Sequence, residues 1–341
     1  MNVLIGLSGG LDSTYAAHRL KNEGHSVTGA SVVMHDYTDT GAAEKAAQEV
    51  GIPFVKIDMR GTFEKEVIDP FCRAYINAYT PNPCVMCNPA VKFAALYDYA
   101  QKHNFDRIAT GHYARIGCEN GRFFISTADD DSRDQSYVLW GLSQEQLSML
   151  FFPLSSMKKT DIRADAERLG LSAAEAKESR EICFIPSNNY AEYIEKRMNT
   201  SFPPGDFIDD SGKKVGEHKG IIHYTIGQRK GLGLAMNGQV FVTDIDPVSN
   251  TVTVSRAGNE YSDRAMLCGL RFQKLAPANG TYRAEVKIRY AARPVPAEVT
   301  IQNDSAEVLF TEPVRAVTPG QSAVFYDGGD LLFGGIITKN K

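Results

Sequence analysis

Two cysteines separated by two residues, Cys84 and Cys87, stand among prolines in the stretch TPNPCVMCNPAVKF. A Cys-x-x-Cys pair is typical of a redox disulfide, half of a zinc site or part of an iron–sulfur site, and it also arises by chance. Zinc is the weaker alternative, because a structural zinc site normally has four protein ligands and no histidine lies close in the sequence. The pair therefore indicates thiol or iron–sulfur chemistry and leaves the choice between them open.

A glycine-rich turn, IGLSGGLDS, joins an apolar run to a helical pattern near the N-terminus. Glycine permits a tight turn, so the backbone N–H groups of Ser8, Gly9 and Gly10 can face a phosphate. The helix expected from Asp12 adds the positive end of its dipole, and Ser13 adds a hydroxyl donor. No Gly-Lys-Ser/Thr follows, so this is not a Walker A loop, and two glycines alone would also suit an ordinary helix N-cap.

The complete pattern Ser-Gly-Gly-x-Asp-Ser after an N-terminal strand resembles the PP-loop of the ATP pyrophosphatases. Those enzymes split ATP between the α- and β-phosphates, adenylate a carbonyl oxygen and release pyrophosphate. The resemblance implies ATP with Mg²⁺ at this loop, and it implies an activating enzyme instead of a kinase. The residues that it assigns to the nucleotide are Gly6, Leu7, Ser8, Gly9, Gly10, Leu11, Asp12, Ser13, Met34 and Gly111.

Eight stretches, in order over nearly the whole chain, resemble the bacterial tRNA-specific 2-thiouridylases, which replace the C2 oxygen of the wobble uridine with sulfur. They are SGGLDS, TPNPCVMCNPAVKF, ATGHYAR, DQSYVLWGLSQEQLSMLFFPL, ICFIP, GEHKGIIHYTIGQRKGLGL, VKIRY and EPVRAVTPGQSAVFYDG. The chemistry agrees with this resemblance. Oxide is a poor leaving group from a pyrimidine carbonyl, so attaching AMP to that oxygen prepares C2 for a sulfur nucleophile.

The resemblance gives two cysteines catalytic roles. Cys183, in ICFIP, would carry the terminal sulfur of a persulfide, and Cys87 would help to release that sulfur and end in a disulfide with Cys183. Both roles need thiolates, whose pKa must be lowered by nearby cations or helix N-termini. Lys177 and Arg180 are the candidate cations. Without the family, a cysteine between two apolar residues would be interpreted as a buried core thiol.

Cys84 departs from the family, which mostly has aspartate at this position. An aspartate could polarise the base or assist proton transfer, and a thiol does both poorly. Other tRNA-thiolating PP-loop enzymes hold a [4Fe–4S] cluster by three cysteines and bind the incoming sulfur at the fourth iron. Three interpretations therefore stay open for Cys84: a cluster ligand together with Cys87 and Cys183, a spare resolving thiol, or a neutral substitution.

Contacts with RNA are expected in several segments. GKKVGEHKGIIHYTIGQRKG holds five basic residues against one acid, a patch that suits phosphates but also an ordinary solvated loop: Lys213, Lys214, Lys219, Arg229 and Lys230 against Glu217. The resemblance places the flipped uridine at Asn82, Pro83 and Cys84. It places other parts of the tRNA at His112, Arg133, Asp134, Gln135, Arg289, Tyr290 and Gln321, and the Tyr290 ring could stack on an unpaired base.

The elements that must position these residues are of two kinds. Up to residue 199, apolar runs alternate with helical patterns, which predicts strands at 2–7, 26–34, 53–58 and 107–113 and helices at 12–22, 40–51, 63–79 and 90–103. This alternation predicts a doubly wound, mostly parallel sheet of the PP-loop, adenine nucleotide alpha hydrolase-like type. Ligands in such sheets bind at the carboxyl ends of the strands, where the glycine-rich turn and the loop at 110–112 both fall.

A stretch rich in proline and glycine near residues 200–212 ends the helical pattern, and short alternating strands follow it. The fold class is therefore α/β plus β. We expect a PP-loop catalytic domain at 1–199, a central β domain at 200–263 and a barrel-like β domain at 264–341, with both β domains contacting tRNA.

Composition limits the class and the compartment. The 341 residues are 43% hydrophobic and 23% charged, as in a folded chain of more than one domain. A net charge of −4 excludes a uniformly basic coat for nucleic acid but not a basic face. No apolar run approaches the roughly 20 residues of a membrane helix, and the start MNVLIGLSGG indicates a buried strand instead of a signal peptide. We expect a cytoplasmic monomer without membrane contact.

The sequence thus predicts a tRNA-uridine 2-sulfurtransferase. It would adenylate the C2 oxygen with ATP and then transfer sulfur from a Cys183 persulfide or from a [4Fe–4S]-bound sulfur, with a cysteine desulfurase or a relay protein as donor. Two alternatives remain: a divergent homologue that binds tRNA or a cluster without thiolating, and a PP-loop ligase that uses ammonia.

Overall fold

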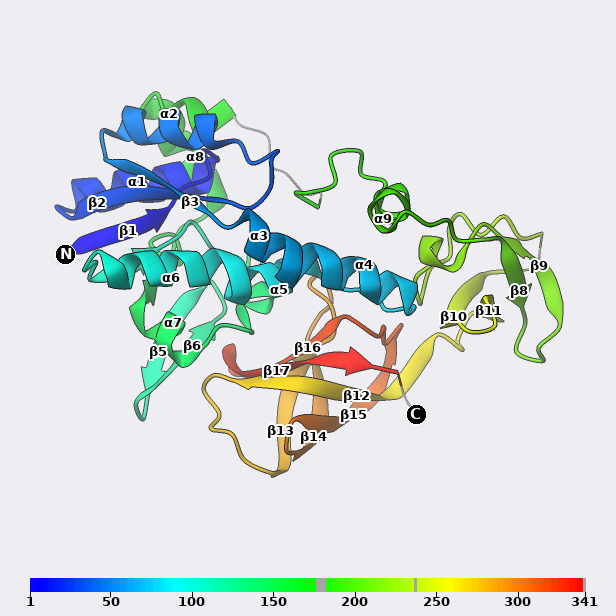
Figure 1. Cartoon of the computed structure of the whole chain (residues 1–341). Coiled ribbons are helices and arrows are strands. Elements are labelled where there is room, and N and C mark those ends of the chain that lie inside the picture. Colours follow the sequence, from blue (N-terminus) through cyan, green and yellow to red (C-terminus); the bar gives the residue numbers. More distant parts are fainter. Residues whose placement is uncertain (176–181, 236–237, 340–341) are drawn as a thin grey trace.

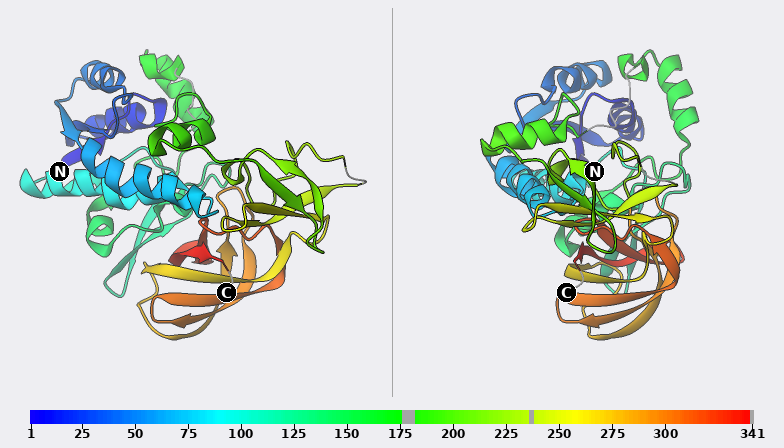
Figure 2. Two further views of the ribbon diagram at one scale, coloured as in Figure 1. Left: turned by 45° about the vertical axis from the view of Figure 1, so that its right-hand side comes forward. Right: turned by 90° about the vertical axis from the view of Figure 1, so that its right-hand side faces the viewer.

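The structure is a computed structural model that describes residues 1–175, 182–235 and 238–339 (Figure 1). It contains a parallel sheet flanked by helices, a small four-stranded β domain and a C-terminal barrel. Two further views (Figure 2) show the barrel beneath the long helical run in the middle of the molecule and the small β domain at one end of that run. The predicted α/β plus β class is confirmed.

The N-terminal sheet has five parallel strands in the order β3-β2-β1-β4-β7. This order places β1 and β4 side by side at the centre. The chain that follows β1 leads to β2 on one side of this pair, and the chain that follows β4 leads to β7 on the other. Such a switch point opens a crevice outside the carboxyl ends of the two strands. The strands are β1 (Asn2–Gly6), β2 (Ser26–Val33), β3 (Phe54–Asp58), β4 (Arg107–Ala109) and β7 (Leu150–Phe151).

Alternate residues of β1 face opposite sides of this sheet, so each side has its own core. Leu4 packs in a cluster with Phe71, whereas Val3 and Ile5 pack with Ala16. The first side is covered by α3 (Arg60–Phe63), α4 (Asp69–Ile76), α5 (Pro83–Cys87) and α6 (Phe93–Lys102). The second side is covered by α1 (Leu11–Asn22), α2 (Thr40–Val50) and α8 (Lys159–Arg168). The sheet is therefore doubly wound, as predicted.

The two longest predicted helices are interrupted. The run at 63–79 consists of α3, a π-helical turn η1 (Glu64–Ile68) and α4, and the run at 90–103 continues from α5 through a second π-helical turn, η2 (Asn88–Lys92), into α6. Pro70 and Pro89 lie in the first turns of α4 and η2. Proline has no N–H to donate and crowds the preceding turn, which favours a local change of helical pitch.

The central β domain is a four-stranded sheet in the order β10-β11-β8-β9. Its strands are β8 (Gly205–Ile208), β9 (Lys214–His218), β10 (Val240–Asp246) and β11 (Thr251–Arg256). Short helical elements connect the domains or lie within them: η3 (Ser136–Leu139), α7 (Gln144–Met149), η4 (Ser172–Glu175), α9 (Tyr190–Met198) and η5 (Ile221–His223).

The C-terminal domain is a closed barrel in the order β12-β15-β14-β13-β16-β17, with β17 pairing back to β12. Its strands are β12 (Tyr261–Phe272), β13 (Gly280–Lys287), β14 (Val295–Gln302), β15 (Ser305–Arg315), β16 (Ser322–Asp327) and β17 (Asp330–Thr338). The hairpin of β5 (Arg115–Glu119) and β6 (Arg122–Ser126) was not predicted from the sequence. Although this hairpin belongs to the N-terminal part of the chain, its strand β6 pairs with β17 of the barrel.

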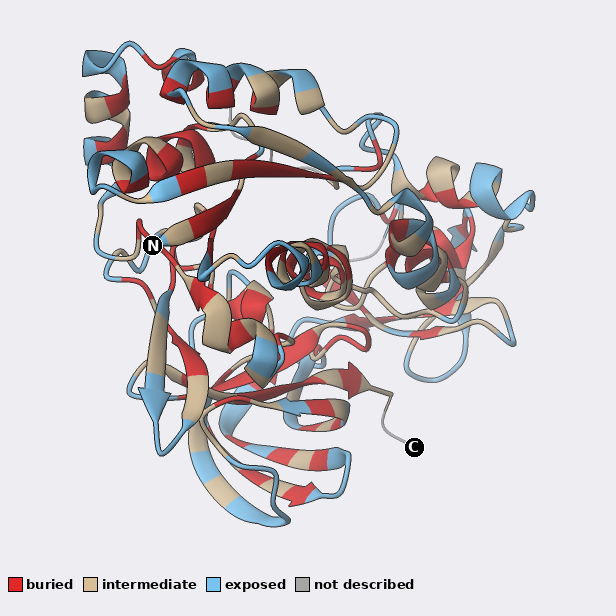
Figure 3. Cartoon of the chain, turned by 60° about the vertical axis from the view of Figure 1, so that its left-hand side comes forward, coloured by how far each residue is buried: buried red, intermediate tan, exposed pale blue. Residues whose placement is uncertain are grey.

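One continuous apolar core connects the three parts. The cluster that holds Leu4 and Phe71 also includes Phe207 and Tyr224 of the central domain and Val324 of the barrel. Figure 3 shows this buried interior beneath exposed outer helix faces. In the described part of the chain, no helix has both the length and the apolar character needed to cross a membrane.

Candidate active site

The glycine-rich turn after β1 has the geometry expected of an anion-binding loop. The backbone N–H of Ser8 donates to the Ser13 hydroxyl at 3.2 Å, and that hydroxyl in turn donates to the carbonyl of Gly10 at 3.2 Å. Gly9 has a φ of +78°, and a β-carbon there would lie 2.5 Å from the carbonyl carbon of Ala42. The turn therefore needs glycine for its conformation and for its close contact with α2.

The loop after β4 lies against the same helix N-terminus. A β-carbon on Gly111 would lie 2.7 Å from the backbone nitrogen of Ser13, so Gly111 must lack a side chain. The β-carbon of any residue replacing Gly6 would lie 3.2 Å from the Thr110 methyl group. Leu7 and Leu11 are buried in the core, which leaves only their backbone for a ligand. The predicted nucleotide residues thus gather at the switch point.

A buried lysine that sequence analysis missed completes this loop. Lys159, the first residue of α8, places its ammonium 2.5 Å from the Asp12 carboxylate, and the Tyr113 hydroxyl donates to the same oxygen at 2.7 Å. The Lys159 side chain is only 10% exposed. No motif surrounds it in the sequence; its neighbour Lys158 looks identical there but is exposed.

His112 is enclosed beside the loop. Its Nδ1 lies 2.7 Å from the Thr110 hydroxyl, and its ring contacts those of Phe93 and Phe152. Desolvation, with a smaller contribution from the positive charge of Lys92, lowers the pKa of His112 to about 3. The imidazole is therefore neutral at physiological pH.

Cys87 connects the thiol segment with the nucleotide loops. Its Sγ lies 3.5 Å from the Sδ of Met34, the first residue after β2, so it reaches the same edge of the sheet as the glycine-rich turn. The residue is only 8% exposed. Burial raises the pKa of the Cys87 thiol to about 12, and the nearby thiols of Cys183 and Cys84 add to this increase. The Cys87 sulfur is therefore protonated at neutral pH.

The other two thiols lie near Cys87 but are more accessible. Cys84 and Cys183 are both exposed. Phe184, beside Cys183, is buried in edge-on contact with Phe63 and Phe71, which anchors the ICFIP segment to the core that also holds Cys87. None of the six cysteines, all of which are described, forms a disulfide. Desolvation by the surrounding protein and the charge of Cys84 raise the pKa of the Cys183 thiol.

Lys92 is the cation that opposes the increase in the pKa of the two cysteines. It lies at the end of η2, and its charge lowers the pKa of both Cys87 and Cys183. It is the one charged residue within TPNPCVMCNPAVKF, a signal that sequence analysis did not use. The two cations that sequence analysis proposed instead, Lys177 and Arg180, lie outside the described residues.

The three thiols do not form a metal site as they are placed here. Within the described ranges, no group of three or more His, Cys, Asp or Glu side chains is arranged to hold a metal ion. Cys84, Cys87 and Cys183 are the ligand type of a [4Fe–4S] cluster, and a cluster held by these three residues stays a prediction.

Several residues that the resemblance assigned to tRNA have partners within the protein. Asp134 is buried and accepts from the hydroxyl of Ser136 at 2.7 Å and from the backbone N–H of Ala128 at 3.2 Å. The side-chain oxygen of Gln135 accepts from the backbone N–H of Tyr113 at 2.9 Å. These two residues hold the loop after β4, next to the half-buried Arg133.

Two predicted tRNA residues of the barrel also make internal contacts. Arg289 donates to the carbonyls of Ile226 and Ala316 at 3.2 and 2.8 Å. The amide of Gln321 donates to the carbonyl of Thr80 at 2.6 Å. By contrast, Tyr290 is 44% exposed, although the Lys287 ammonium lies over its ring and the Tyr137 ring contacts its edge.

The segment expected at the flipped base begins α5. Asn82 caps this helix, because its side-chain oxygen accepts from the backbone N–H of Cys84 at 3.1 Å. Pro83 occupies the first turn, where its missing N–H costs no hydrogen bond. Cys84 is therefore presented to solvent by a capped helix N-terminus.

A basic cleft lies between the central domain and the barrel. It has a volume of about 730 Å³, and Arg229, Lys230, Arg315 and the half-exposed Tyr261 line it together with Phe241 and with Glu260, whose carboxylate pairs with Arg315 at 3.4 Å. Among the described residues, Arg229 and Lys230 have no ion-pair partner, so their charges are available to an anion. The other lysines of the predicted patch do not line this cleft.

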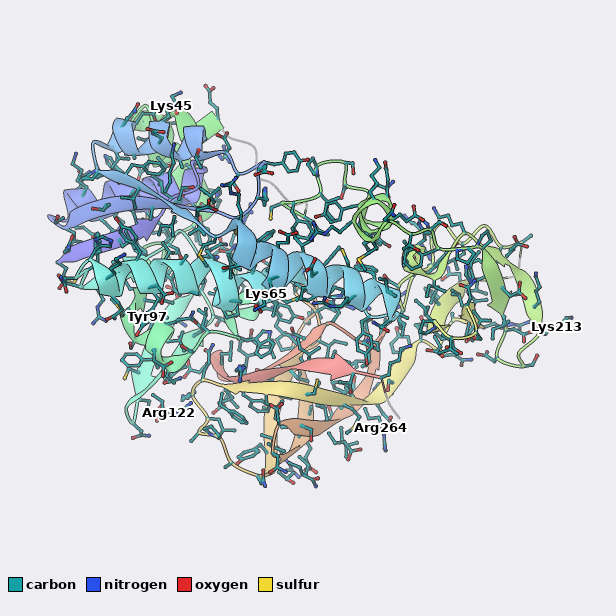
Figure 4. All side chains as sticks on the ribbon, in the orientation of Figure 1. Lys45, Lys65, Tyr97, Arg122, Lys213 and Arg264 are labelled. Carbon is teal, nitrogen blue, oxygen red and sulfur yellow. The ribbon has the colours of Figure 1, made fainter. Side chains whose placement is uncertain are left out.

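Lys213 lies at the outer end of the central domain (Figure 4), and Lys214 pairs with Asp206 at 2.5 Å. The predicted patch therefore divides into a cleft-lining part, Arg229 and Lys230, and a peripheral part.

A parallel sheet with Ser-Gly-Gly-x-Asp-Ser at its switch point defines a nucleotide-binding domain of the PP-loop class. Family profiles match three consecutive segments: a "tRNA methyl transferase HUP domain" at residues 1–187, a "tRNA methyl transferase PRC-barrel domain" at 191–256 and an "Aminomethyltransferase beta-barrel domain" at 266–337. The second profile starts inside α9, so the domain boundaries at 199 and 263 stay predictions.

Curated relatives resemble the chain over its whole length. The tRNA-specific 2-thiouridylase MnmA of Clostridium perfringens is 41% identical over 350 residues, covering 98% of both chains. The enzyme of the same name from Clostridium acetobutylicum is 40% identical over 352 residues, covering 99% of both chains. The chain belongs to the tRNA-specific 2-thiouridylase family.

Proposed function

We propose that this chain thiolates the wobble uridine of tRNA at C2, using ATP to activate the oxygen and a persulfide on Cys183 to supply the sulfur. The observation that carries the proposal is the 3.5 Å contact between the Cys87 sulfur and Met34. It brings the cysteine segment to the edge of the sheet where the PP-loop turn, Gly111 and Lys159 converge. An activated oxygen and a reactive sulfur can meet only at such a junction.

The adenylation step uses the loops at the switch point. The backbone N–H groups of Ser8–Gly10 and the N-terminus of α1 bind phosphate oxygens. Asp12 would offer a carboxylate oxygen, a ligand type that Mg²⁺ prefers, to the Mg²⁺ that accompanies ATP. Lys159 then faces the phosphates with its positive charge. The C2 oxygen attacks the α-phosphorus, pyrophosphate leaves, and the base carries AMP on that oxygen.

The sulfur step uses both cysteines. The terminal sulfur of the Cys183 persulfide attacks C2, and AMP leaves with the oxygen. Cys87 then attacks the inner sulfur, so the sulfur–sulfur bond breaks, a Cys87–Cys183 disulfide forms, and the terminal sulfur stays on C2. An external thiol reductant supplies the two electrons that restore the thiols. Lys92 lowers the pKa of both thiols, and the proton that Cys87 gives up as it attacks passes to the thiolated base, whose sulfur is released as an anion.

Supply of sulfur and binding of RNA complete the proposal. A cysteine desulfurase, directly or through a relay protein, loads Cys183, which is exposed and therefore accessible to a donor protein. The tRNA contacts Tyr290 and the basic cleft at Arg229 and Lys230. We further propose that the protein acts as a cytoplasmic monomer. No step is assigned to iron, because the persulfide route needs only the sulfurs of Cys183 and Cys87.

Mass spectrometry of tRNA nucleosides tests this function. The parent protein, supplied with ATP, tRNA and a persulfide donor, should produce 2-thiouridine at the wobble position, and Cys183→Ala should produce none while still releasing pyrophosphate. Cys118→Ala, which alters an exposed cysteine outside the site, is the matched control and should retain full activity.

Two results would contradict the proposal. Thiolation by Cys183→Ala at the parent rate would exclude the persulfide at this position. Iron bound stoichiometrically by anaerobically purified parent protein, and lost from Cys84→Ala, would favour the cluster over the persulfide.

A further inference from the structure

The segment that leads into α5 is held by residues from both β domains. The backbone N–H of Thr80 donates to the carbonyl of Pro319 at 2.8 Å. The amide of Gln321 donates to the Thr80 carbonyl at 2.6 Å, so one loop of the barrel satisfies both backbone groups of Thr80. The Thr80 hydroxyl lies 3.3 Å from that of Thr225, which belongs to the central domain.

The barrel loop approaches too closely for this contact to be incidental. Gly320 has a φ of +92°, and a β-carbon there would lie 2.8 Å from the backbone nitrogen of Thr80. Only glycine suits both the conformation and the space. The loop between β15 and β16 is thus shaped to the backbone of the catalytic domain.

Thr80 is close in sequence to the thiols that it would position. Asn82, two residues later, caps α5, and the helix is only five residues long. Although α5 continues through η2 into α6, its first turn has no preceding turn to hold it, so the position of that turn depends on its cap and on buried side chains. Val85 and Cys87 supply the buried side chains, and Thr80 fixes the segment before the cap.

We propose that Gln321 is a positioning residue for the thiol segment, acting through the Thr80 carbonyl, and that Thr225 assists it from the central domain. The two β domains therefore hold Cys87 against Met34 before any RNA is bound. Only the expected effect of Gln321 and Thr225 on turnover rests on the proposed function. The mechanical role is independent of tRNA and of ATP.

The alkylation rate of Cys87 measures this role directly. In protein without tRNA or ATP, iodoacetamide labelling of Cys87, followed by peptide mass spectrometry, should be roughly two- to tenfold faster in Gln321→Ala and in Thr225→Val, as expected for loss of one hydrogen bond. Thr225→Ser keeps the hydroxyl and should restore the parent rate. Gln302→Ala, at an exposed end of β14, is the matched control and should label at the parent rate.

Cys72 distinguishes a local change from general loosening. It is fully buried on α4, so its labelling should stay at the parent rate in every variant. In turnover, Thr225→Val should lower kcat while the KM for tRNA is retained.

Unchanged Cys87 labelling in Gln321→Ala, or labelling of Cys72 that increases in parallel, would overturn the proposal. Because labelling needs no substrate, failure of the proposed thiolation would leave this result unaffected.

Discussion

At the scale of single residues, the charge state of Cys87 is a balance between burial and Lys92. Burial raises the pKa of this thiol to about 12, against an ordinary value of 9.0. The buried thiol favours the folded state while it is protonated. This contribution to stability is complete below about pH 9 and is lost as the pH rises toward 12, because the unfolded chain ionises first.

Replacing the shared cation should slow both thiols. In Lys92→Met the pKa of Cys87 and of Cys183 should increase, because the charge that lowers them is gone, and alkylation of both at fixed pH should slow by roughly threefold or more. Lys102→Met, at the exposed end of α6, is the matched control. Alkylation rates measured from pH 7 to 10 test this prediction, and identical pH profiles for the two variants would contradict it.

Lys159 is placed against its intrinsic preference. A cation at the first position of a helix opposes the helix dipole, and its near-complete burial adds a desolvation cost. The pairing with Asp12 offsets both costs. The same pairing cancels a negative charge that would otherwise face the phosphates.

Lys159→Met should therefore increase the KM for ATP in pyrophosphate release by roughly tenfold or more, because it exposes the phosphates to the uncompensated charge of Asp12. Lys158→Met alters the exposed neighbour and should leave the KM unchanged. Equal effects of the two substitutions would show that Lys159 has no special role at the nucleotide.

At the scale of elements, two glycines with nearly the same φ distinguish the effect of backbone conformation from the effect of a close contact. Gly9 has a φ of +78° and lies against α2, whereas Gly121 has a φ of +77° in the β5–β6 turn with nothing within 4 Å of a β-carbon. Alanine at either position costs about 1 kcal/mol in backbone strain. Only at Gly9 must the loop also move.

We expect Gly121→Ala to lower the free energy of unfolding by about 1 kcal/mol and to retain the parent KM for ATP. Gly9→Ala should lose most ATP-dependent pyrophosphate release, because the displaced turn no longer directs its N–H groups at the phosphates. Urea denaturation and a pyrophosphate assay on both variants test the pair. Parent-like turnover by Gly9→Ala would contradict the loop geometry.

At the scale of the whole molecule, Arg289 fastens the central domain to the barrel. Its guanidinium reaches the carbonyls of Ile226 and Ala316 and the hydroxyl of Thr318, and its Nε is buried without a partner. No carboxylate within the described residues pairs with it, so this partly buried cation depends on backbone oxygens of two domains.

Arg289→Met should lower the free energy of unfolding by about 2 kcal/mol, since it removes charge-assisted hydrogen bonds across a domain interface. It should also increase proteolysis near residue 226. Arg283→Met, whose side chain is 88% exposed, is the matched control and should change stability by less than about 0.5 kcal/mol. Denaturation and limited proteolysis test both variants, and equal stabilities would contradict the proposed fastening.

The sequence alone determined those features of the protein that depend on patterns of neighbouring residues. The alternation of strands and helices predicted the doubly wound sheet, and the glycine-rich turn predicted the place of the PP-loop at its switch point, because periodicity and glycine spacing act over a few residues. Cys87 and Cys183 could be named from motifs, although their roles came from resemblance to a family. The two β domains followed from the shorter alternating runs after residue 200.

Only the tertiary structure decided which side chains meet across long separations. Lys158 and Lys159 are equivalent in sequence, and packing of α8 against α1 alone makes one of them the partner of Asp12, 147 residues away. The β5–β6 hairpin joins the barrel, and Gln321 reaches Thr80, for the same reason. Such contacts depend on how cores bury surface between distant segments, which no local pattern encodes.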